Sequence, residues 1–559
     1  MIDAPFLLSI IIIMPLLLAV GVVVSVTQRV AIKIAPWAAL PALLAGLLLD
    51  DGKLQLPGML INSYLLFDHT GRLFLLMSAI LWLATGLLHQ AHSGALYAQQ
   101  KIVFKLLAMT GCFFMSLAGD VLMFMTATTL TGYSLYGLLA QEKNTTTREA
   151  VNVMLVVLVV SDIVLFELLQ LLGMHAVSVD FIAMRQAFVI TEQMNVQFGL
   201  LLFGLGAKIG LLGLHFWLIP VFITSHLALR PALISFVFSA GFIGWLRLFP
   251  LGEVHYPAIG ELLQWGAWLM LGYALLLGVR QIHRRGVLAV LLMIVTALWL
   301  SIVAAILIQP ELWLSLNRNL VSAVTQMGLV LSALMIGQGL HKHKPAWKHR
   351  YALTLWLAIF LLTVAPISLV SHFVSVNSLT VASLWIGAGL MMFILWRTHF
   401  MLLAAAEASS KSGGHKMRHT DSSVTHYLFS GLVLVGLMTA VPNLKMLSMF
   451  TVFSLFLLLG SMLVLAWLTR FYKPTEPSQL MSGFIMQQFK QGRSMIMEMT
   501  QYLDIYSNRL QKSIKKRFSP IFVLSHFSRY ERSLNRWSVA LIIMVLIGLL
   551  VSVQGLLNQ

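Results

Sequence analysis

The stretch GAKIGLLGLHFWL, residues 206 to 218, places a lysine inside a segment that otherwise has the composition of a membrane-spanning helix. An ammonium group at bilayer depth costs about 3 kcal/mol on insertion scales. Lys208 is expected about eleven residues from each end of a helix over 197–218, too far for its side chain to reach a membrane surface easily. A buried lysine can release its proton near neutral pH, which an arginine cannot. Lys208 is therefore a candidate functional residue, and a structural ion pair is the alternative.

The composition indicates an all-α polytopic membrane protein. The chain has 559 residues, of which 59% are hydrophobic and 10% charged, with a mean hydropathy of +0.88. Many segments exceed the roughly 18 apolar residues that indicate a membrane span. The single cysteine, Cys112, excludes an intramolecular disulfide and any Cys-based metal site. The net charge of +17 is attributed to basic cytoplasmic loops beside anionic lipid rather than to nucleic-acid binding.

The hydrophobic pattern predicts about sixteen transmembrane helices, with broken helices and inverted repeats of the kind found in transporters. Three parts of the chain are expected: a transmembrane domain over 1–470, a cytoplasmic-side amphipathic lateral helix segment over 471–535, and a C-terminal transmembrane helix over 536–559. The helices are expected near 5–27, 30–50, 70–91, 102–118, 120–140, 149–173, 197–218, 230–250, 258–279, 286–309, 313–340, 351–374, 378–399, 426–443, 446–470 and 536–556.

Loop charges predict the orientation of these helices. By count, 30 of the 37 Lys and Arg residues fall on the side of the loops that follow odd-numbered helices, and six fall on the other side. Basic residues accumulate in cytoplasmic loops, so both termini are expected in the periplasm of a bacterial cell, with the protein in the inner membrane. Within 478–518, apolar residues recur at near-helical spacing opposite a basic face, which predicts the lateral helix.

Polar residues inside the predicted spans are the candidates for a proton path. Asp162 and Glu167 in LVVSDIVLFELL, residues 158–169, are possible partners of Lys208, and their spacing lets at most one face it closely. His215 could relay protons near neutral pH or simply be hydrogen-bonded. His372 follows Pro366, which could break the twelfth helix and expose backbone groups. Four threonines of the fifth helix either bond to their own helix or line a wet channel: Thr126, Thr128, Thr129 and Thr131.

Other chemistry has little support in the sequence. Histidines cluster in HKHKPAWKH, residues 341–349, without carboxylates or cysteines beside them, so no metal site is assigned. No phosphate-binding loop, dinucleotide fingerprint, zinc-protease motif or nucleophile elbow stands in a suitable context. We therefore expect neither a cofactor nor catalysis by this chain alone.

The segment from Lys208 to Leu218 resembles the antiporter-like membrane subunits of respiratory complex I, Mrp-type cation/proton antiporters and membrane-bound hydrogenases. That family carries Lys-Ser-Ala-Gln-x-Pro-x-His-x-Trp-Leu in a broken seventh helix, and Lys208, His215, Trp217 and Leu218 fall in register with it. RQIHRRGVLA at 280–289, Asp162 and TVAPISLVSHF at 363–373 resemble further family positions. The resemblance implies a proton path through the membrane.

Departures from the family pattern imply that this path is shortened. The family's fifth-helix glutamate falls near Thr129, its eighth-helix histidine near Leu233, and its eleventh-helix His and Lys near Thr325 and Leu329. Its twelfth-helix lysine is replaced by an apolar residue beside His372. LTGYSLYGLL at 130–139 resembles instead a stretch of the DAB-type inorganic carbon pumps, whose membrane subunit works with a large zinc-containing partner related to carbonic anhydrase.

We therefore expect a proton- or cation-conducting subunit of a multi-subunit membrane complex that energises a partner, such as one for uptake of CO2 or bicarbonate. The alternatives are a proton-pumping subunit of a complex I-like or hydrogenase complex, and a non-conducting scaffold. The coupled ion and its direction stay open. The expected proton path comprises Lys208, Asp162, His215, His372, Glu167 and Thr129.

Overall fold

The computed structural model describes residues 4–56, 63–92, 99–141, 145–190, 194–281, 284–337, 348–374, 377–411 and 429–436. The chain divides into two compact units, Met1–Glu476 and Pro477–Gln559, and every described residue lies in the first. The helices expected at 446–470 and 536–556, and the amphipathic segment 471–535, lie outside the described residues.

The chain begins with two membrane segments and a hairpin. Helix α1 (Ala4–Val23) is followed by α2 (Gln28–Ile34), a 3-10 turn η1 (Ala35–Trp37) and α3 (Leu40–Leu48). Pro36 and Pro41 stand at the starts of η1 and α3, where a proline is tolerated, so the expected single helix over 30–50 is divided. Strands β1 (Gly52–Gln55) and β2 (Tyr64–Phe67) then form an antiparallel hairpin that the helical pattern did not predict.

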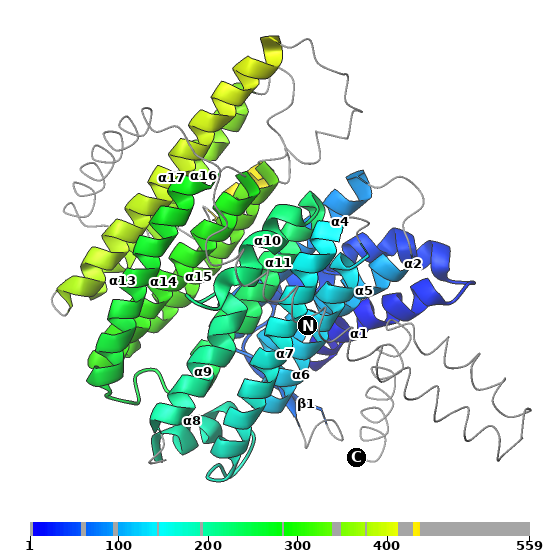
Figure 1. Cartoon of the computed structure of the whole chain (residues 1–559). Coiled ribbons are helices and arrows are strands. Elements are labelled where there is room, and N and C mark those ends of the chain that lie inside the picture. Colours follow the sequence, from blue (N-terminus) through cyan, green and yellow to red (C-terminus); the bar gives the residue numbers. More distant parts are fainter. Residues whose placement is uncertain are drawn as a thin grey trace, which may run out of the picture. The chain divides into compact units, whose positions relative to one another are not determined.

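Five helices follow, and they lead to the candidate site (Figure 1). They are α4 (His69–His92), α5 (Gln99–Leu117), α6 (Val121–Leu139), α7 (Thr145–Gly173) and the short α8 (Phe181–Ile190). Helix α6 begins at an N-cap: the Oδ1 atom of Asp120 accepts a hydrogen bond of 2.8 Å from the backbone N–H of Met123. Helix α6 packs between α5 and α7, and α7 packs against α9.

The next two membrane segments are irregular. The first consists of α9 (Met194–Ile209), a 3-10 turn η2 (His215–Trp217) and α10 (Leu218–Thr224). The second follows the 3-10 turn η3 (Leu227–Leu229) and consists of α11 (Arg230–Val237), a π-helical turn η4 (Phe238–Phe242) and α12 (Ile243–Leu248). π-helical turns are rare and frequently mark functional sites. The break expected in the Lys208 helix is thus present in the structure.

The remaining described helices pack side by side in Figure 1, coloured green to yellow. They are α13 (Pro257–Arg280), α14 (Arg284–Ile308), α15 (Leu312–Gly337), α16 (Lys348–Ser368), the 3-10 turn η7 (Val370–His372) and α17 (Ser378–Lys411). Helix α14 lies at the centre of this set, in contact with α10, α13, α15 and α17.

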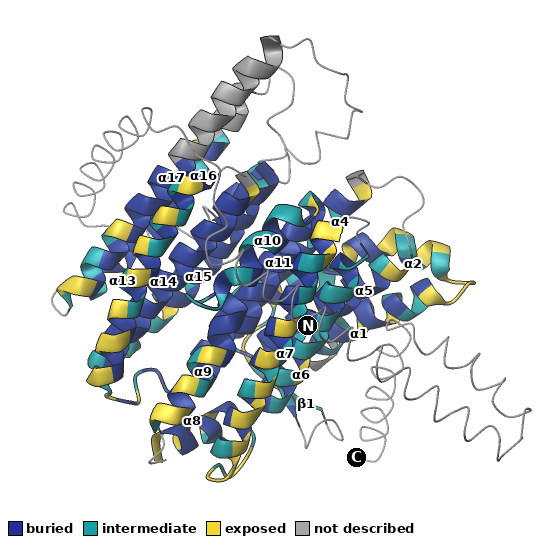
Figure 2. Cartoon of the chain, viewed as in Figure 1, coloured by how far each residue is buried: buried dark blue, intermediate teal, exposed yellow. Residues whose placement is uncertain are grey.

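Helix length and burial support the membrane fold. Within the described residues, ten helices are long and apolar enough to cross a membrane, and several shorter apolar helices accompany them. Figure 2 shows α14 and the C-terminal two thirds of α15 almost wholly buried, whereas α7, α8 and α13 carry rows of exposed residues. The prediction of an all-α polytopic membrane protein is confirmed. The predicted number of sixteen helices is not established by the described part of the chain.

Candidate functional site

The helix that carries Lys208 ends directly after it. Gly210 has a φ of 74°, a left-handed conformation that suits glycine, and the N–H of Leu211 donates to the carbonyl of Gly206 at 2.8 Å. This bond joins residues five apart, as in a Schellman cap at a helix C-terminus. Lys208 therefore lies in the last turn of α9, and its expected place in the middle of a continuous helix was wrong. The glycine cap ends the helix where a continuous apolar pattern predicted that it would go on.

Three groups satisfy the carbonyl oxygens that this break releases. The N–H of Leu211 bonds to Gly206, the indole Nε1 of Trp217 donates to the carbonyl of Ala207 at 2.9 Å, and the hydroxyl of Thr296 donates to the carbonyl of Ile209 at 2.9 Å. Buried carbonyl groups without a partner would each cost free energy. The end of α9 is therefore an ordered break with paired carbonyl groups rather than a frayed helix end.

The break is also fixed by packing against the rest of the chain. Thr296 belongs to α14, so its bond to Ile209 ties the end of α9 to the second set of helices. Gly241, in the π-helical turn, lies directly against Ile209, since an added Cβ there would come 1.9 Å from the Cγ2 atom of Ile209. Both contacts constrain the residue that follows Lys208.

Lys208 forms a buried ion pair with Asp162 of α7. The Nζ atom lies 2.5 Å from Oδ1 of Asp162, and the two side chains are 1% and 16% exposed. The last turn of α9 also presents the negative end of its helix dipole to the ammonium group. Removing one partner of such a pair leaves an uncompensated charge, typically at a cost of about 3–5 kcal/mol. Pairing therefore allows a charged lysine to persist at this depth.

Thr129 of α6 contacts the second carboxylate oxygen of Asp162. Its hydroxyl lies 3.0 Å from Oδ2 of Asp162 and 3.0 Å from the carbonyl of Met125. The two oxygens of Asp162 are thus approached by an ammonium group and by a hydroxyl. Of the six residues expected on the proton path, the structure brings together these three: Lys208, Asp162 and Thr129.

Close packing of α7 and α9 explains why Asp162 reaches Lys208. Gly204 lies against Leu165, because an added Cβ at Gly204 would come 2.5 Å from a methyl carbon of that leucine. The hydroxyl of Ser161, which precedes Asp162, donates to the carbonyl of Gly204 at 2.8 Å. A small residue and an interhelical hydrogen bond are the usual means by which membrane helices approach closely.

His215 forms a separate contact beyond the break. Its Nε2 atom lies 3.2 Å from the hydroxyl of Tyr273 on α13, and the two rings pack edge to face. The side chain is buried, and its Nδ1 atom has no hydrogen-bond partner in the described part of the chain. Its Cβ lies 3.8 Å from where a Cβ on Gly210 would be, which places it beside the break. His215 and Tyr273 therefore form a second polar pair next to the lysine site.

His372 and Glu167 lie apart from Lys208. His372 is half-buried on η7, and its Nε2 atom lies 3.1 Å from the Nδ2 atom of Asn319 on α15. Pro366 lies inside α16, which continues to Ser368 and is followed by η7. The break expected at this proline therefore comes two residues after it. Glu167 is exposed on α7 and does not take part in the Lys208 pair.

The four threonines of α6 separate by face. All four bond to carbonyls of their own helix, which is the first of the two alternatives that the sequence left open. Thr128 and Thr131 are buried and donate to the carbonyls of Met125 and Ala127. Thr126 and Thr129 lie on the more exposed face of the same helix, and Thr129 reaches Asp162.

Sequence reasoning missed two residues that shape this site. Thr296 and Tyr273 are isolated polar residues in apolar helices, and no pattern distinguished them from other hydroxyl-bearing residues there. No cluster of three or more His, Cys, Asp or Glu residues suited to a metal ion occurs in the described part of the chain. Most of the histidine-rich loop at 341–349 lies outside the described residues.

Comparison with known proteins identifies the fold. The structure is similar to a chain of the Mrp complex from Dietzia sp. DQ12-45-1b, with a TM-score of 0.69 and 12% sequence identity, over 98% of this chain and 63% of that one. It is also similar to a chain of the membrane-bound sulfane sulfur reductase, an archaeal respiratory membrane complex, with a TM-score of 0.51, 16% identity, and coverage of 78% and 96%. The chain therefore shares the fold of these two membrane-complex chains.

The resemblance drawn from the sequence is thereby confirmed at the level of the fold. The chain spans 63% of the length of the Mrp complex chain that it matches. A scan against protein-family models gave no match, and no curated protein matches the sequence significantly. The closer resemblance to DAB-type pumps stays a prediction.

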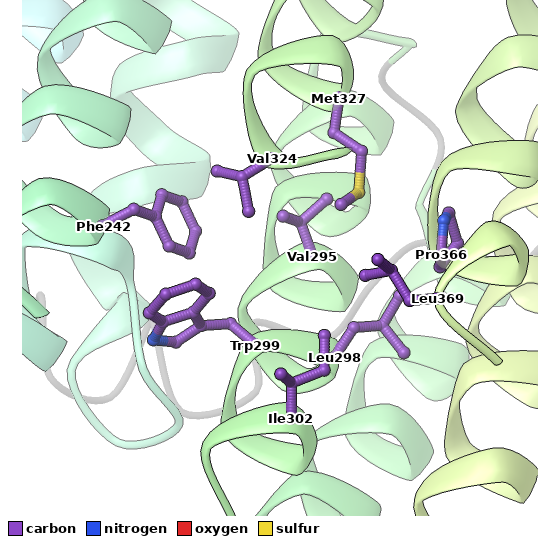
Figure 3. Close-up of a pocket in the computed structure, with 9 residues that line it drawn as sticks. All are labelled: Phe242, Val295, Leu298, Trp299, Ile302, Val324, Met327, Pro366 and Leu369. Atoms are coloured by element: carbon purple, nitrogen blue, oxygen red, sulfur yellow. The ribbon is translucent and has the colours of Figure 1, made fainter. Parts of the chain in front are cut away.

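Residues that cannot ionise stand on α11 and α15 at positions where the resemblance placed ionisable ones. Leu233 and Leu329 are buried, and the hydroxyl of Thr325 bonds to carbonyls of its own helix. Between α14, α15, α16 and η4 lies a small cavity with room for about one water molecule (Figure 3). Its lining is wholly apolar: Phe242, Val295, Leu298, Trp299, Ile302, Val324, Met327, Pro366 and Leu369. Apolar cavities of this kind stay dry.

Proposed function

We propose that this chain is the proton-conducting subunit of a multi-subunit membrane complex, and that Lys208 and Asp162 form its proton-binding site. The observation that carries the proposal is a lysine–carboxylate pair, buried in the membrane, at a helix break built from a glycine cap and three hydrogen bonds. Intramembrane ionisable residues that face one another typically mark ion or proton paths.

The arrangement suits proton exchange better than a fixed structural charge. Among the described residues, Asp162 is the one acidic residue that forms an ion pair with Lys208. Its side chain is partly exposed. Loss of a proton from Lys208 would leave a neutral amine beside a carboxylate that the hydroxyl of Thr129 can still stabilise. His215 and Tyr273, next to the break, would extend the path by one further pair.

We propose one proton half-channel rather than a relay along the membrane plane. Support comes from the dry, apolar cavity among α14, α15 and α16, and from the apolar residues Leu233 and Leu329. A single path would be sufficient for a subunit that lets protons cross and uses their gradient to drive a partner. His372, bonded to Asn319, and the exposed Glu167 fall outside this core path, although the sequence placed both on it.

The partner that we propose takes up inorganic carbon, CO2 or bicarbonate, through a large zinc-containing subunit related to carbonic anhydrase. This proposal rests on the stretch LTGYSLYGLL, which forms the second half of α6 and adjoins Thr129. We place the complex in a bacterial inner membrane with both termini of this chain in the periplasm, as the loop charges predict. A complex I-like or hydrogenase pump subunit is the alternative, and the identity of co-purifying subunits distinguishes the two.

Proton uptake by the assembled complex tests this function. The complex would be reconstituted in proteoliposomes, and uptake driven by an imposed pH gradient would be followed with a pH-sensitive dye. Lys208→Met is expected to abolish uptake. The matched control is Lys105→Met, which removes another buried lysine, on α5, and should leave uptake intact. Full uptake by Lys208→Met at normal assembly would favour the scaffold alternative.

A further inference from the structure

Helix α6 carries a stripe of hydroxyl side chains on one face. Thr126, Thr129, Tyr133 and Tyr136 follow one another at spacings of three, four and three, which places them on the same side of a helix. Thr126 is exposed and the other three are half-buried, whereas Thr128, Thr131 and Ser134 on the opposite side are fully buried. The stripe therefore lies on the less buried side of α6.

The stripe is continuous with the lysine site. Thr129 bonds to Asp162, and Tyr133 follows it one turn further along α6, on the same face of the helix. One turn beyond, the hydroxyl of Tyr136 donates to Oδ1 of Asn152 on α7 at 3.2 Å. Asn152 and Asp162 are ten residues apart on α7, or about 15 Å along the helix. Polar groups thus follow the seam between α6 and α7 from the ion pair toward the cytoplasmic end that the loop charges predict.

We propose that the part of this hydroxyl stripe from Thr129 to Tyr136 is the route by which protons pass between the cytoplasmic side and Lys208, and that a membrane helix of another subunit forms the outer wall of the stripe. The inference rests on the proposed function and adds the entry route to it. Hydroxyl groups both donate and accept hydrogen bonds, so with intervening waters they can pass a proton along. One proton taken from water at the cytoplasmic end would reach the neutral amine of Lys208, which becomes the ammonium paired with Asp162.

A protein partner explains the exposed residues better than lipid does. Glu167, exposed on α7 and flanked by apolar residues, would face hydrocarbon as a carboxylate, which is costly without a cation nearby. The exposed apolar residues Ile163 and Phe166 continue this surface. The occupant is therefore a transmembrane helix that carries a lysine or arginine at the depth of Glu167.

The route is tested by removing single hydroxyls in the assembled complex. Thr129→Val and Tyr133→Phe preserve side-chain shape, and each should lower proton uptake about tenfold or more, as loss of a proton-transfer group does. Thr128→Val, on the buried face of the same helix, is the matched control and should retain uptake. If Thr129→Val and Tyr133→Phe both retain uptake while Lys208→Met abolishes it, the route is overturned and the proposed function stands. Uptake that survives Lys208→Met overturns the function itself.

The outer wall is tested by photocrosslinking within the complex. A benzophenone side chain placed at position 126 should form an adduct with another subunit on illumination. An adduct with lipid alone, or with this chain alone, would overturn the partner wall. Sequencing of the adduct also checks the second requirement, a lysine or arginine in the captured helix near the depth of Glu167, and its absence would contradict the proposed occupant.

Discussion

The ammonium of Lys208 lies 2.5 Å from the carboxylate of Asp162, although the two residues are 46 positions apart in the sequence. Neither charge is stable alone at this depth, because an isolated ion in an apolar medium loses its hydration without compensation. The pair is held where a glycine cap ends α9, and where Thr296 and Trp217 bind the released carbonyl groups. The ion pair therefore depends on the geometry of this helix break.

A double-mutant cycle should expose this coupling. Asp162→Leu leaves the lysine charge unpaired and should destabilise the protein by about 3–5 kcal/mol. Adding Lys208→Met should recover most of that loss, since the double variant has no buried charge. Thermal unfolding of the purified complex in detergent would give the stability of the wild type, of each single variant and of the double variant. Additive effects of the two substitutions would show that the pair contributes no interaction energy.

The helix break should depend on the left-handed residue at its start. Gly210→Ala places a Cβ on a residue with a φ of 74° and should destabilise the protein by about 1–2 kcal/mol. Gly199→Ala lies in the same helix, with open space around it, and should be neutral or stabilise the protein by up to about 1 kcal/mol. Unfolding midpoints of the two variants provide the comparison. Equal effects would mean that the Gly210 cap does not determine where α9 ends.

Much of the fold could be predicted because membrane helices are specified by local composition. Thirteen of the expected spans correspond to helical segments of the structure, from α1 to α17. The pattern could not show that proline divides the segment 30–50, or that Tyr64–Phe67 pairs with Gly52–Gln55. Both depend on backbone constraints and pairing at a distance rather than on hydropathy.

The site was predictable in its residues but not in its geometry. A lysine and an aspartate at membrane depth are rare enough to be noticed, and their cost implied a pairing. The sequence could not choose between Asp162 and Glu167, because this choice depends on the contact of Gly204 with Leu165. It also gave Lys208 a mid-helix place, since Gly210 is conspicuous only once its φ is known.

Asp120 should make stability fall as the pH rises. Burial raises the pKa of this carboxyl, and nearby Asp180 adds to the effect. The folded protein then holds a proton that the unfolded chain, with a pKa of about 3.9, has released, so stability decreases between that pH and the raised pKa. Asp120→Asn does not titrate and retains an N-cap for α6.

The unfolding midpoint of Asp120→Asn relative to the wild type should therefore increase as the pH rises above about 4. Differential scanning fluorimetry of both proteins at a series of pH values would measure these unfolding midpoints. A constant difference between the two proteins would show that Asp120 has the same proton affinity in the folded and unfolded states.

Glu167 should matter for assembly rather than for proton binding. It is exposed on α7 and apart from the Lys208 pair, so Glu167→Gln should lower the recovery of partner subunits in pull-downs while uptake per assembled complex stays unchanged. Glu261→Gln removes an exposed carboxylate from α13 and is the matched control. Normal recovery with lost uptake would place Glu167 on the proton path after all.

The most direct measurement is proton uptake by Lys208→Arg in the reconstituted complex, read beside expression and assembly. Arginine preserves the positive charge and can still pair with Asp162, but it does not release a proton near neutral pH. The variant should therefore assemble normally and be nearly as inactive as Lys208→Met. Full uptake by Lys208→Arg would show that residue 208 provides a fixed charge and would contradict the proton-binding role of the Lys208–Asp162 pair.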